Sequence, residues 1–206
     1  MRKVAESTIR RLSLYLRFLE EFEGQGMATV SSGALASRGG TTSAQVRKDL
    51  SFFGSFGKRG LGYPVPELVE RLRGILGLTR RYSVAMIGAG KIGSALVQYR
   101  GFRQRGFDIV AIFDVDPAKI GRQWNGLQIL DIAALESQFQ HGGIDMAVLV
   151  TPAEAAQPLA DRLVALGVKA ILNFAPVQLV VPEDVVVKTV NLALELETLS
   201  YALASR

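Results

Sequence analysis

The sequence lacks cysteine, and its 206 residues include only one histidine and one tryptophan. The absence of cysteine excludes a disulfide framework, zinc–thiolate sites and thiol nucleophiles, and it agrees with a reducing compartment. No apolar run approaches the ~20 residues of a membrane span, and Met1-Arg2-Lys3 does not begin a signal peptide. The sequence therefore predicts a cytoplasmic protein with no membrane segment and no metal site.

Positive charge is concentrated in the first part of the chain. Residues 1–80 carry 13 Lys or Arg against 7 Asp or Glu, a net charge of +6, whereas residues 81–206 have a net charge of −1. A basic part joined to a near-neutral part favours a polyanion partner for the former. A basic surface also occurs without such a partner, so charge alone leaves both interpretations open.

A glycine motif, Gly-x-Gly-x-x-Gly, follows the apolar run 84–87 and opens a helical pattern. In a nucleotide-binding strand–turn–helix, the first glycine permits the turn, the second admits a phosphate, and the third allows close packing. A second strand-like run ends at Asp114, 21 positions after Gly93, where a carboxylate would bind the ribose of NAD. The alternative is a purely structural turn with a solvated Asp114. The candidate cofactor residues here are Gly88, Ala89, Gly90, Lys91, Ile92, Gly93 and Asp114.

The basic part has the outline of a helix-turn-helix. Apolar spacing predicts three helices: 4–23, a short one capped by Ser31 or Ser32 and ending at Gly39-Gly40, and one capped by Thr41 or Thr42 that runs through Leu50. A tight glycine-containing turn separates the last two. The polar residues of the third helix suit contacts to phosphates and base edges, although an ordinary solvated face has the same composition. They are Ser43, Gln45, Arg47 and Lys48.

A glycine-rich segment, 52–63, follows the third helix and carries Lys58, Arg59 and Gly60 at its tip. Such a loop can lie along a DNA backbone or insert an arginine into a narrow minor groove. A phosphate-binding loop is the less favoured alternative, because no strand precedes it and no Lys-Ser/Thr helix start follows. A wing beside a recognition helix is therefore predicted.

The remaining chain alternates strands and helices. A helix from Pro64-Val65-Pro66 to Gly77 leads to a boundary near 78–82; strands are predicted at 127–130, 144–150, 168–172 and 185–187, and helices at 153–166 and 189–204. This alternation predicts a parallel, doubly wound sheet. Ligands lie at the carboxyl ends of its strands, and two predicted strand ends carry Thr151-Pro152 and Asn173-Phe174-Ala175-Pro176.

The sequence offers a cofactor site without an evident reaction site. The one histidine, His141, lies in a segment that reads as a loop, and a loop histidine is usually only solvated. No carboxylate pair or Ser/His arrangement stands out to supply acid–base chemistry. An NAD-dependent dehydrogenase is thus the less favoured reading, and the chain is predicted not to be an enzyme.

Several motifs together resemble the Rex family of redox-sensing repressors over nearly the whole chain. They are 45–54, 57–63, the glycine motif 88–93, Tyr99-Arg100-Gly101-Phe102, 113–117 and Asn173-Phe174-Ala175-Pro176. The resemblance implies an α/β fold with an N-terminal winged helix-turn-helix domain at 1–80. A Rossmann-like NAD(H)-binding domain at 81–188 and a C-terminal domain-swapped dimerisation helix at 189–206 would complete it.

The same resemblance implies a homodimeric transcriptional repressor that senses the NADH/NAD⁺ ratio. It would bind inverted-repeat operator DNA and be released by NADH. Thr151, Pro152 and residues 173–176 would lie near the nicotinamide, and Tyr99 would also bind the cofactor. In the family, an aspartate exchanges between a tyrosine, matched by Tyr99, and an arginine, matched by Arg17. Here that position is Asn191, which cannot form an ion pair. The alternative is a divergent paralogue, or a DNA-binding protein that senses CoA or another adenine nucleotide, with weakened redox discrimination.

Overall fold

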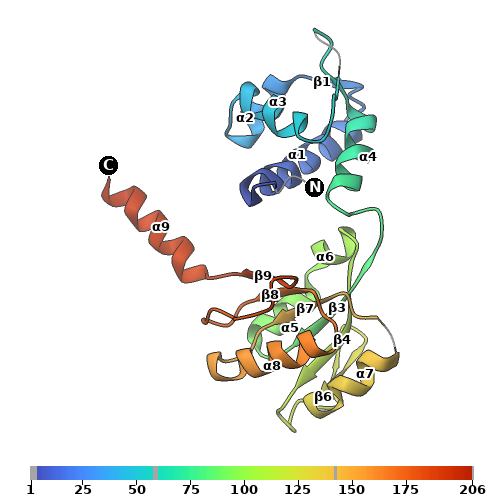
Figure 1. Ribbon diagram of the computed structural model, residues 1–206, viewed down its shortest axis with the longest axis vertical. Helices are drawn as coiled ribbons and strands as arrows, with labels where there is room; N and C mark the ends of the chain where they lie inside the picture. Colours follow the sequence, from blue (N-terminus) through green and yellow to red (C-terminus); the bar gives the residue numbers. More distant parts are fainter. Residues whose placement is uncertain (1–3, 58–59, 142, 206) are drawn as a thin grey trace. The chain divides into compact units, whose positions relative to one another are not determined.

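The computed structural model describes residues 4–57, 60–141 and 143–205 (Figure 1). The chain divides into two compact units, Met1–Arg80 and Arg81–Arg206. The first is mainly helical, and the second is built on a seven-stranded sheet.

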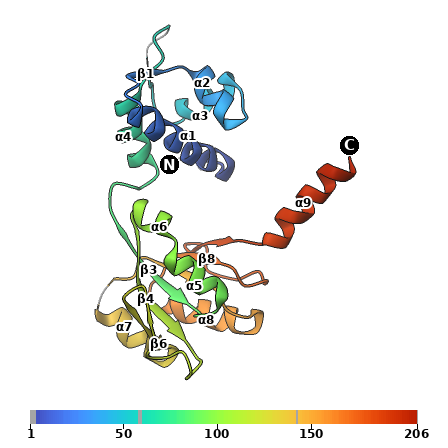
Figure 2. The same ribbon diagram turned by 180° about the vertical axis from the view of Figure 1, so that it is seen from behind.

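The first unit packs its helices around one apolar core. Its elements are α1 (Glu6–Gly24), β1 (Thr29–Val30), α2 (Ser32–Gly39), α3 (Ser43–Ser51), β2 (Tyr63–Pro64) and α4 (Val65–Ile75). The apolar stripe of α1 is buried against α4 (Figure 2). The side chains of Ser31 and Thr42 cap α2 and α3 by accepting backbone N–H groups, and each is one of the two candidates that the sequence offered. The antiparallel pair β1–β2, which closes the base of the glycine-rich segment, was not predicted.

The second unit alternates strands and helices. Its elements are β3 (Tyr82–Ile87), α5 (Lys91–Gln98), α6 (Arg100–Gln104), β4 (Phe107–Asp114), β5 (Gln123–Trp124), β6 (Leu127–Asp131), the 3₁₀ helix η1 (Ile132–Ala134), α7 (Leu135–His141), β7 (Met146–Leu149), α8 (Ala153–Ala165), β8 (Ala170–Asn173), β9 (Val186–Thr189) and α9 (Leu192–Ala204).

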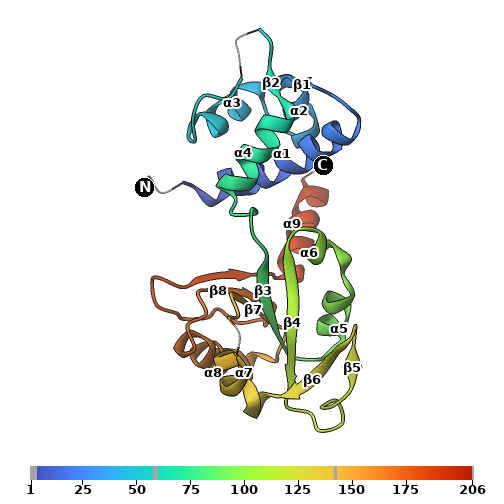
Figure 3. The same ribbon diagram turned by 90° about the vertical axis from the view of Figure 1, so that its right-hand side faces the viewer.

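The sheet order is β5-β6-β4-β3-β7-β8-β9, and every pairing except β5–β6 is parallel. From β3 the chain winds first toward β6 and then back toward β9, so the predicted doubly wound parallel sheet is confirmed. Helices α7 and α8 cover one face and α5 lies on the other (Figure 3). The order reverses between β3 and β7, which is where ligands bind in such sheets.

Two local predictions need correction. His141 was placed in a loop, but it is the last residue of α7. The helix forms because Leu135 is buried and Phe139, one turn later, packs against the same core. The last helix begins at Leu192 and not at residue 189, since Thr189 still pairs with Asn173 in the sheet. Among the described helices, none combines the length and the apolar character needed to span a membrane.

Candidate nucleotide and nucleic-acid sites

The three glycines of the motif have different surroundings. Gly88 follows β3 with φ +107°, and a Cβ there would lie 2.6 Å from the carbonyl oxygen of Val150. A Cβ on Gly93 would collide with the carbonyl oxygen of Gly88, whereas one on Gly90 would meet nothing within 4 Å. The first and third glycines therefore permit close backbone packing, and the second faces open space that a phosphate can occupy.

A cavity of about 690 Å³ lies over the carboxyl ends of β3, β4 and β7. The predicted residues that line it are Gly88, Gly90, Lys91, Ile92, Asp114, Thr151 and Pro152. It is also lined by Asp116 and Lys119, which sequence reasoning missed. Lys119 could have been found from its position five residues after Asp114, since at that spacing its amine reaches the Asp114 carboxylate, at 3.3 Å.

Asp114 is 9% exposed, and its two oxygens accept hydrogen bonds from different groups. One accepts the N–H of Ala89 at 2.6 Å and the amine of Lys119, and the other accepts the N–H of Asp116 at 2.9 Å. Burial raises the pKa of Asp114, but these hydrogen bonds outweigh burial and hold the pKa below its ordinary value. The carboxylate is therefore charged at neutral pH, with lone pairs left to accept ribose hydroxyls.

Two further features of this cavity fit a phosphate-bearing nucleotide. The hydroxyl oxygen of Thr151 is buried and has no hydrogen-bond partner among the described residues, so a ligand can supply one. No described side chain caps α5, which leaves the positive end of its helix dipole available to an anion.

The other predicted cofactor residues do not line this cavity with their side chains. The N–H of Ala89 is used by Asp114, and Tyr99 is 57% exposed and packs edge-on against Phe102. Asn173 is fully buried, and within the described part of the chain its amide bonds only to the backbone of Ala175 and Val177. A cofactor contact by Ala89 and Tyr99 stays a prediction, as does the place of Asn173, Phe174, Ala175 and Pro176 near a nicotinamide.

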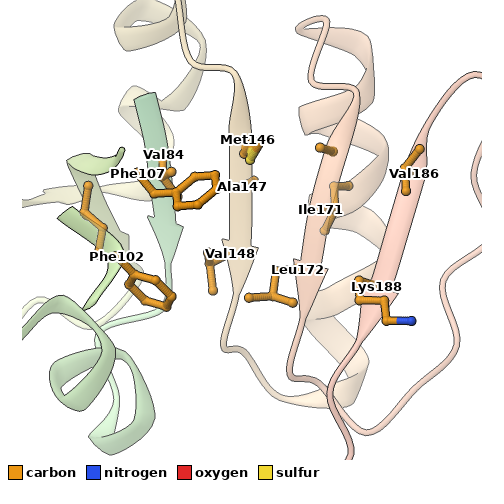
Figure 4. A pocket seen from close by; sticks show the side chains of 12 residues that line it. Val84, Phe102, Phe107, Met146, Ala147, Val148, Ile171, Leu172, Val186 and Lys188 are labelled. Atoms are coloured by element: carbon orange, nitrogen blue, oxygen red, sulfur yellow. The ribbon is translucent and has the colours of Figure 1, made fainter. Parts of the chain in front are cut away.

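An apolar pocket opens on the sheet of the second unit. The pocket, of about 310 Å³, extends over β3, β7, β8 and β9, and its lining includes Phe107, Met146, Val148 and Leu172 (Figure 4). Helix α9 buries none of its residues, and Leu192, Leu194, Leu196, Leu199, Tyr201 and Leu203 are 57–74% exposed. Contiguous apolar surface of this kind marks a protein–protein contact.

The polar face of α3 is the candidate nucleic-acid interface. Val46 and Leu50 are buried, Arg47 and Lys48 are exposed, and Ser43 and Gln45 are half-buried. The guanidinium of Arg47 donates to the hydroxyl of Ser32 on α2 at 3.1 Å. Arg47 and Ser32 line one groove with Gly57, Gly60, Gly62 and Tyr63, so the structure brings α3 and the glycine-rich segment together. Lys58 and Arg59 lie outside the described residues.

Behind this face, α3 is tied to α1 through a carboxylate that sequence reasoning missed. Asp49 is fully buried and accepts two hydrogen bonds from Arg11, at 2.6 and 2.7 Å, one from the Tyr15 hydroxyl at 3.0 Å, and one from the Gln45 amide at 2.8 Å. Burial raises the pKa of Asp49, but these donors outweigh it and hold the pKa below its ordinary value. Burial, reinforced by Asp49, raises the pKa of Tyr15 to about 12.

The predicted switch residues occupy separate elements. Arg17 is exposed on α1, and Asn191 caps α9 by accepting the N–H groups of Ala193 and Leu194. Asn191 therefore has a local role in starting α9. Among the described residues, no group of three or more His, Asp or Glu side chains is placed to hold a metal ion.

Two family models and many relatives match this sequence. Residues 79–177 match the "CoA binding domain" family, and residues 3–51 match the "Putative DNA-binding protein N-terminus" family. The redox-sensing transcriptional repressor Rex of Carboxydothermus hydrogenoformans is 49% identical over 97% of this chain and 96% of its own length. The chain belongs to the Rex family. The Rex repressor of Thermus thermophilus is likewise 49% identical, over 98% of this chain and 94% of its own length.

Solved Rex structures share the whole fold. RSP, a Rex-family repressor, aligns with a TM-score of 0.91 at 39% identity, covering 100% of this chain and 96% of RSP. RSP in complex with NAD⁺ and operator DNA aligns with a TM-score of 0.94 at 40% identity, over 100% of this chain and 94% of RSP. The Rex relatives are named as transcriptional repressors, and a further RSP structure contains NADH.

Proposed function

We propose that this Rex-family chain is a transcriptional repressor that senses the NADH/NAD⁺ ratio. As a homodimer it binds inverted-repeat operator DNA, and NADH releases it. The observation that supports this best is the cavity over the Gly88–Gly93 turn, with the Asp114 carboxylate inside it, in a chain whose other unit presents a basic α3. The RSP complexes with NADH, and with NAD⁺ and operator DNA, support the same assignment.

In this proposal the chain has three functional parts. Residues 1–80 bind DNA, residues 81–188 bind NAD(H), and residues 189–206 form a helix exchanged with the partner subunit. The DNA contacts come from Ser43, Gln45, Arg47 and Lys48 on α3 and from Lys58, Arg59 and Gly60 in the wing. Two such units on one dimer read two half-sites about one helical turn apart.

Replacing Arg47 with alanine is expected to weaken operator binding about tenfold. The exposed Arg47 guanidinium lies beside the glycine-rich segment, where it would contact a phosphate or a guanine. Fluorescence anisotropy with a labelled duplex measures the change. The matched control is Arg122→Ala, which removes an exposed arginine from the second unit and should leave affinity within twofold. Equal losses in the two variants would contradict a contact at Arg47.

The nucleotide lies along the cavity, with its ribose on Asp114 and its phosphates on the turn 88–93. Thr151, Pro152 and residues 173–176 are proposed to surround the nicotinamide, and Tyr99 is proposed to contact the cofactor. NAD⁺ has a positively charged ring and NADH does not, so a closed apolar pocket at the dimer interface disfavours NAD⁺. Closure around NADH would then rotate the subunits and change the separation of the two wings.

Dimerisation is proposed to use α9, the exposed apolar helix. The double change Leu196→Glu and Leu199→Glu is expected to weaken the dimer at least a hundredfold, since burying each leucine contributes roughly 1.5–3 kcal/mol. Light scattering across a dilution series measures the effect. Glu197→Gln, on the same helix, is the control, and an unchanged dimer in the double variant would exclude α9 from the interface.

Two observations favour a second candidate function. The CoA-binding family model matches residues 79–177, and Asn191 has no charge with which to exchange between Tyr99 and Arg17. In this version the repressor senses CoA or another adenine nucleotide, with weakened redox discrimination.

We also infer that the chain is not an enzyme and that it acts in the cytoplasm. Among the described residues that line the cavity, none is a histidine, and Asp114 is already held by three donors. This arrangement suits binding more than proton transfer.

A gel-shift experiment on an inverted-repeat duplex tests the proposal. The protein should retard the duplex alone and with NAD⁺, and NADH should release it at a much lower concentration than NAD⁺. Release by CoA but not by NADH would establish the second candidate. Failure to bind any inverted-repeat duplex at moderate salt would exclude both.

A further inference from the structure

Asp49 accepts four hydrogen bonds, three from α1 and one from its own helix, α3. A buried carboxylate is costly unless hydrogen bonds satisfy its oxygens. Arg11 on α1 provides a bidentate pair of bonds, and Tyr15 on the same helix provides a third. These bonds already join α1 to α3. The fourth donor, Gln45, lies on α3 itself, one turn before Asp49, and is a residue of the proposed DNA-reading face.

The hydrogen bond between Gln45 and Asp49 fixes the orientation of the Gln45 amide. Nε2 of Gln45 donates to Oδ1 of Asp49 at 2.8 Å. An ionised carboxylate only accepts hydrogen bonds, so the amide cannot turn its own oxygen toward Asp49. Gln45 must therefore keep one N–H on Asp49, which leaves its Oε1 and its second N–H for another partner.

That remaining pair of groups matches one base edge. In the major groove, adenine presents an amine donor at N6 and an acceptor at N7, and a glutamine amide satisfies both. Gln45 is the third residue of α3, and its backbone N–H is bound by the capping Thr42. Residues at this end of a recognition helix contact base edges.

We propose that Asp49 is a positioning residue that sets the base preference of α3. By holding the Gln45 amide with its acceptor and remaining donor exposed, it makes the helix select adenine at one position of each half-site. This inference rests on the proposed DNA-binding function of α3.

The experiment first finds the base that Gln45 reads. Inverted-repeat duplexes selected from a randomised pool by the wild-type protein are changed one base pair at a time, symmetrically in both half-sites. Affinities are measured for the wild type and for Gln45→Ala. Gln45→Ala should lose about tenfold of the preference at one A·T pair and keep the preferences elsewhere.

The decisive variant replaces Arg11 with methionine and Asp49 with leucine together. Exchanging a buried ion pair for apolar groups of similar size is often neutral for stability. The buried Tyr15 hydroxyl also loses its acceptor in this variant, so a thermal melt checks that the fold remains. The double variant should lose about tenfold of the preference at the pair identified with Gln45→Ala, and at no other. Tyr15→Phe is the matched control, because it removes one bond to Asp49 without touching Gln45, and it should keep that preference.

Two results overturn the inference alone: no base-specific loss in Gln45→Ala, or a full preference for adenine in the folded double variant. If the double variant does not fold, Asp49→Asn replaces it. An amide at this position can offer Gln45 either an oxygen or a nitrogen, so the preference should still fall, and its retention would overturn the inference. A wild-type protein that binds no inverted-repeat duplex overturns the inference together with the proposed function.

Discussion

Asp49→Ala is expected to lower the free energy of unfolding of the first unit by about 3 kcal/mol. This value is at the lower end of the cost of removing one partner from a buried ion pair. The change leaves the Arg11 guanidinium, whose side chain is 27% exposed, and the buried Tyr15 hydroxyl without their shared acceptor. It also opens a cavity between α1 and α3. Urea unfolding followed by circular dichroism measures the loss.

The control for this prediction is an ion pair near the surface of the same unit. Arg73 donates to Glu20 at 2.9 Å, but its side chain is half exposed. Arg73→Ala should cost less than 1 kcal/mol, because solvent screens such pairs and their side chains lose entropy in forming them. Similar losses in Arg73→Ala and Asp49→Ala would contradict the importance assigned to burial.

Gly90→Ala is expected to abolish nucleotide binding while leaving the fold intact. An added Cβ meets nothing within 4 Å, and the backbone at Gly90 has a negative φ, −87°, so alanine fits without strain. That Cβ would nevertheless occupy the space through which a phosphate approaches the backbone. We expect NADH affinity to fall at least a hundredfold, measured by nucleotide fluorescence, with a melting temperature within about 2 °C of the wild type.

The contrast with Gly93 makes this prediction specific. Gly93→Ala places its Cβ against the carbonyl oxygen of Gly88, so it should lower the melting temperature as well as the affinity. Gly126→Ala, where the loop is open but φ is +83°, should cost some stability and leave NADH binding unchanged. If Gly90→Ala bound NADH as tightly as the wild type, the proposal that the phosphates contact this turn would be contradicted.

Structure that depends on local sequence patterns was predictable from the sequence, and contacts between residues far apart in the chain were not. The stripe of α1, the capped starts of α2 and α3, and the strand–turn–helix at the glycine motif each depend on neighbours in the chain, so local spacing predicted them, with the cap narrowed to two adjacent residues in each helix. Short α6 and α7 span too few turns to show a periodicity. The same limit explains why His141 was assigned to a loop.

The polar side chains show the same division. Asp114 was found because it ends a strand at a characteristic distance from the glycines. Asp49 was missed because nothing in the run Arg47-Lys48-Asp49 distinguishes a buried acid from a solvated one, and its main partners lie 34 and 38 residues away. Asn173 was singled out because it follows a predicted strand; its side chain bonds to the turn after β8, and its place near the nicotinamide stays a prediction.

The exposed apolar side chains of α9 and the apolar pocket on the sheet have a consequence for how much of this protein a cell must make. If two copies must meet to cover them, the share of chains able to repress rises with the total amount present, because association follows mass action. At low copy number few chains would be dimeric, so the response of repression to nucleotide would be weak. Repression of the target genes would thus depend on the expression level of this protein as well as on the nucleotide.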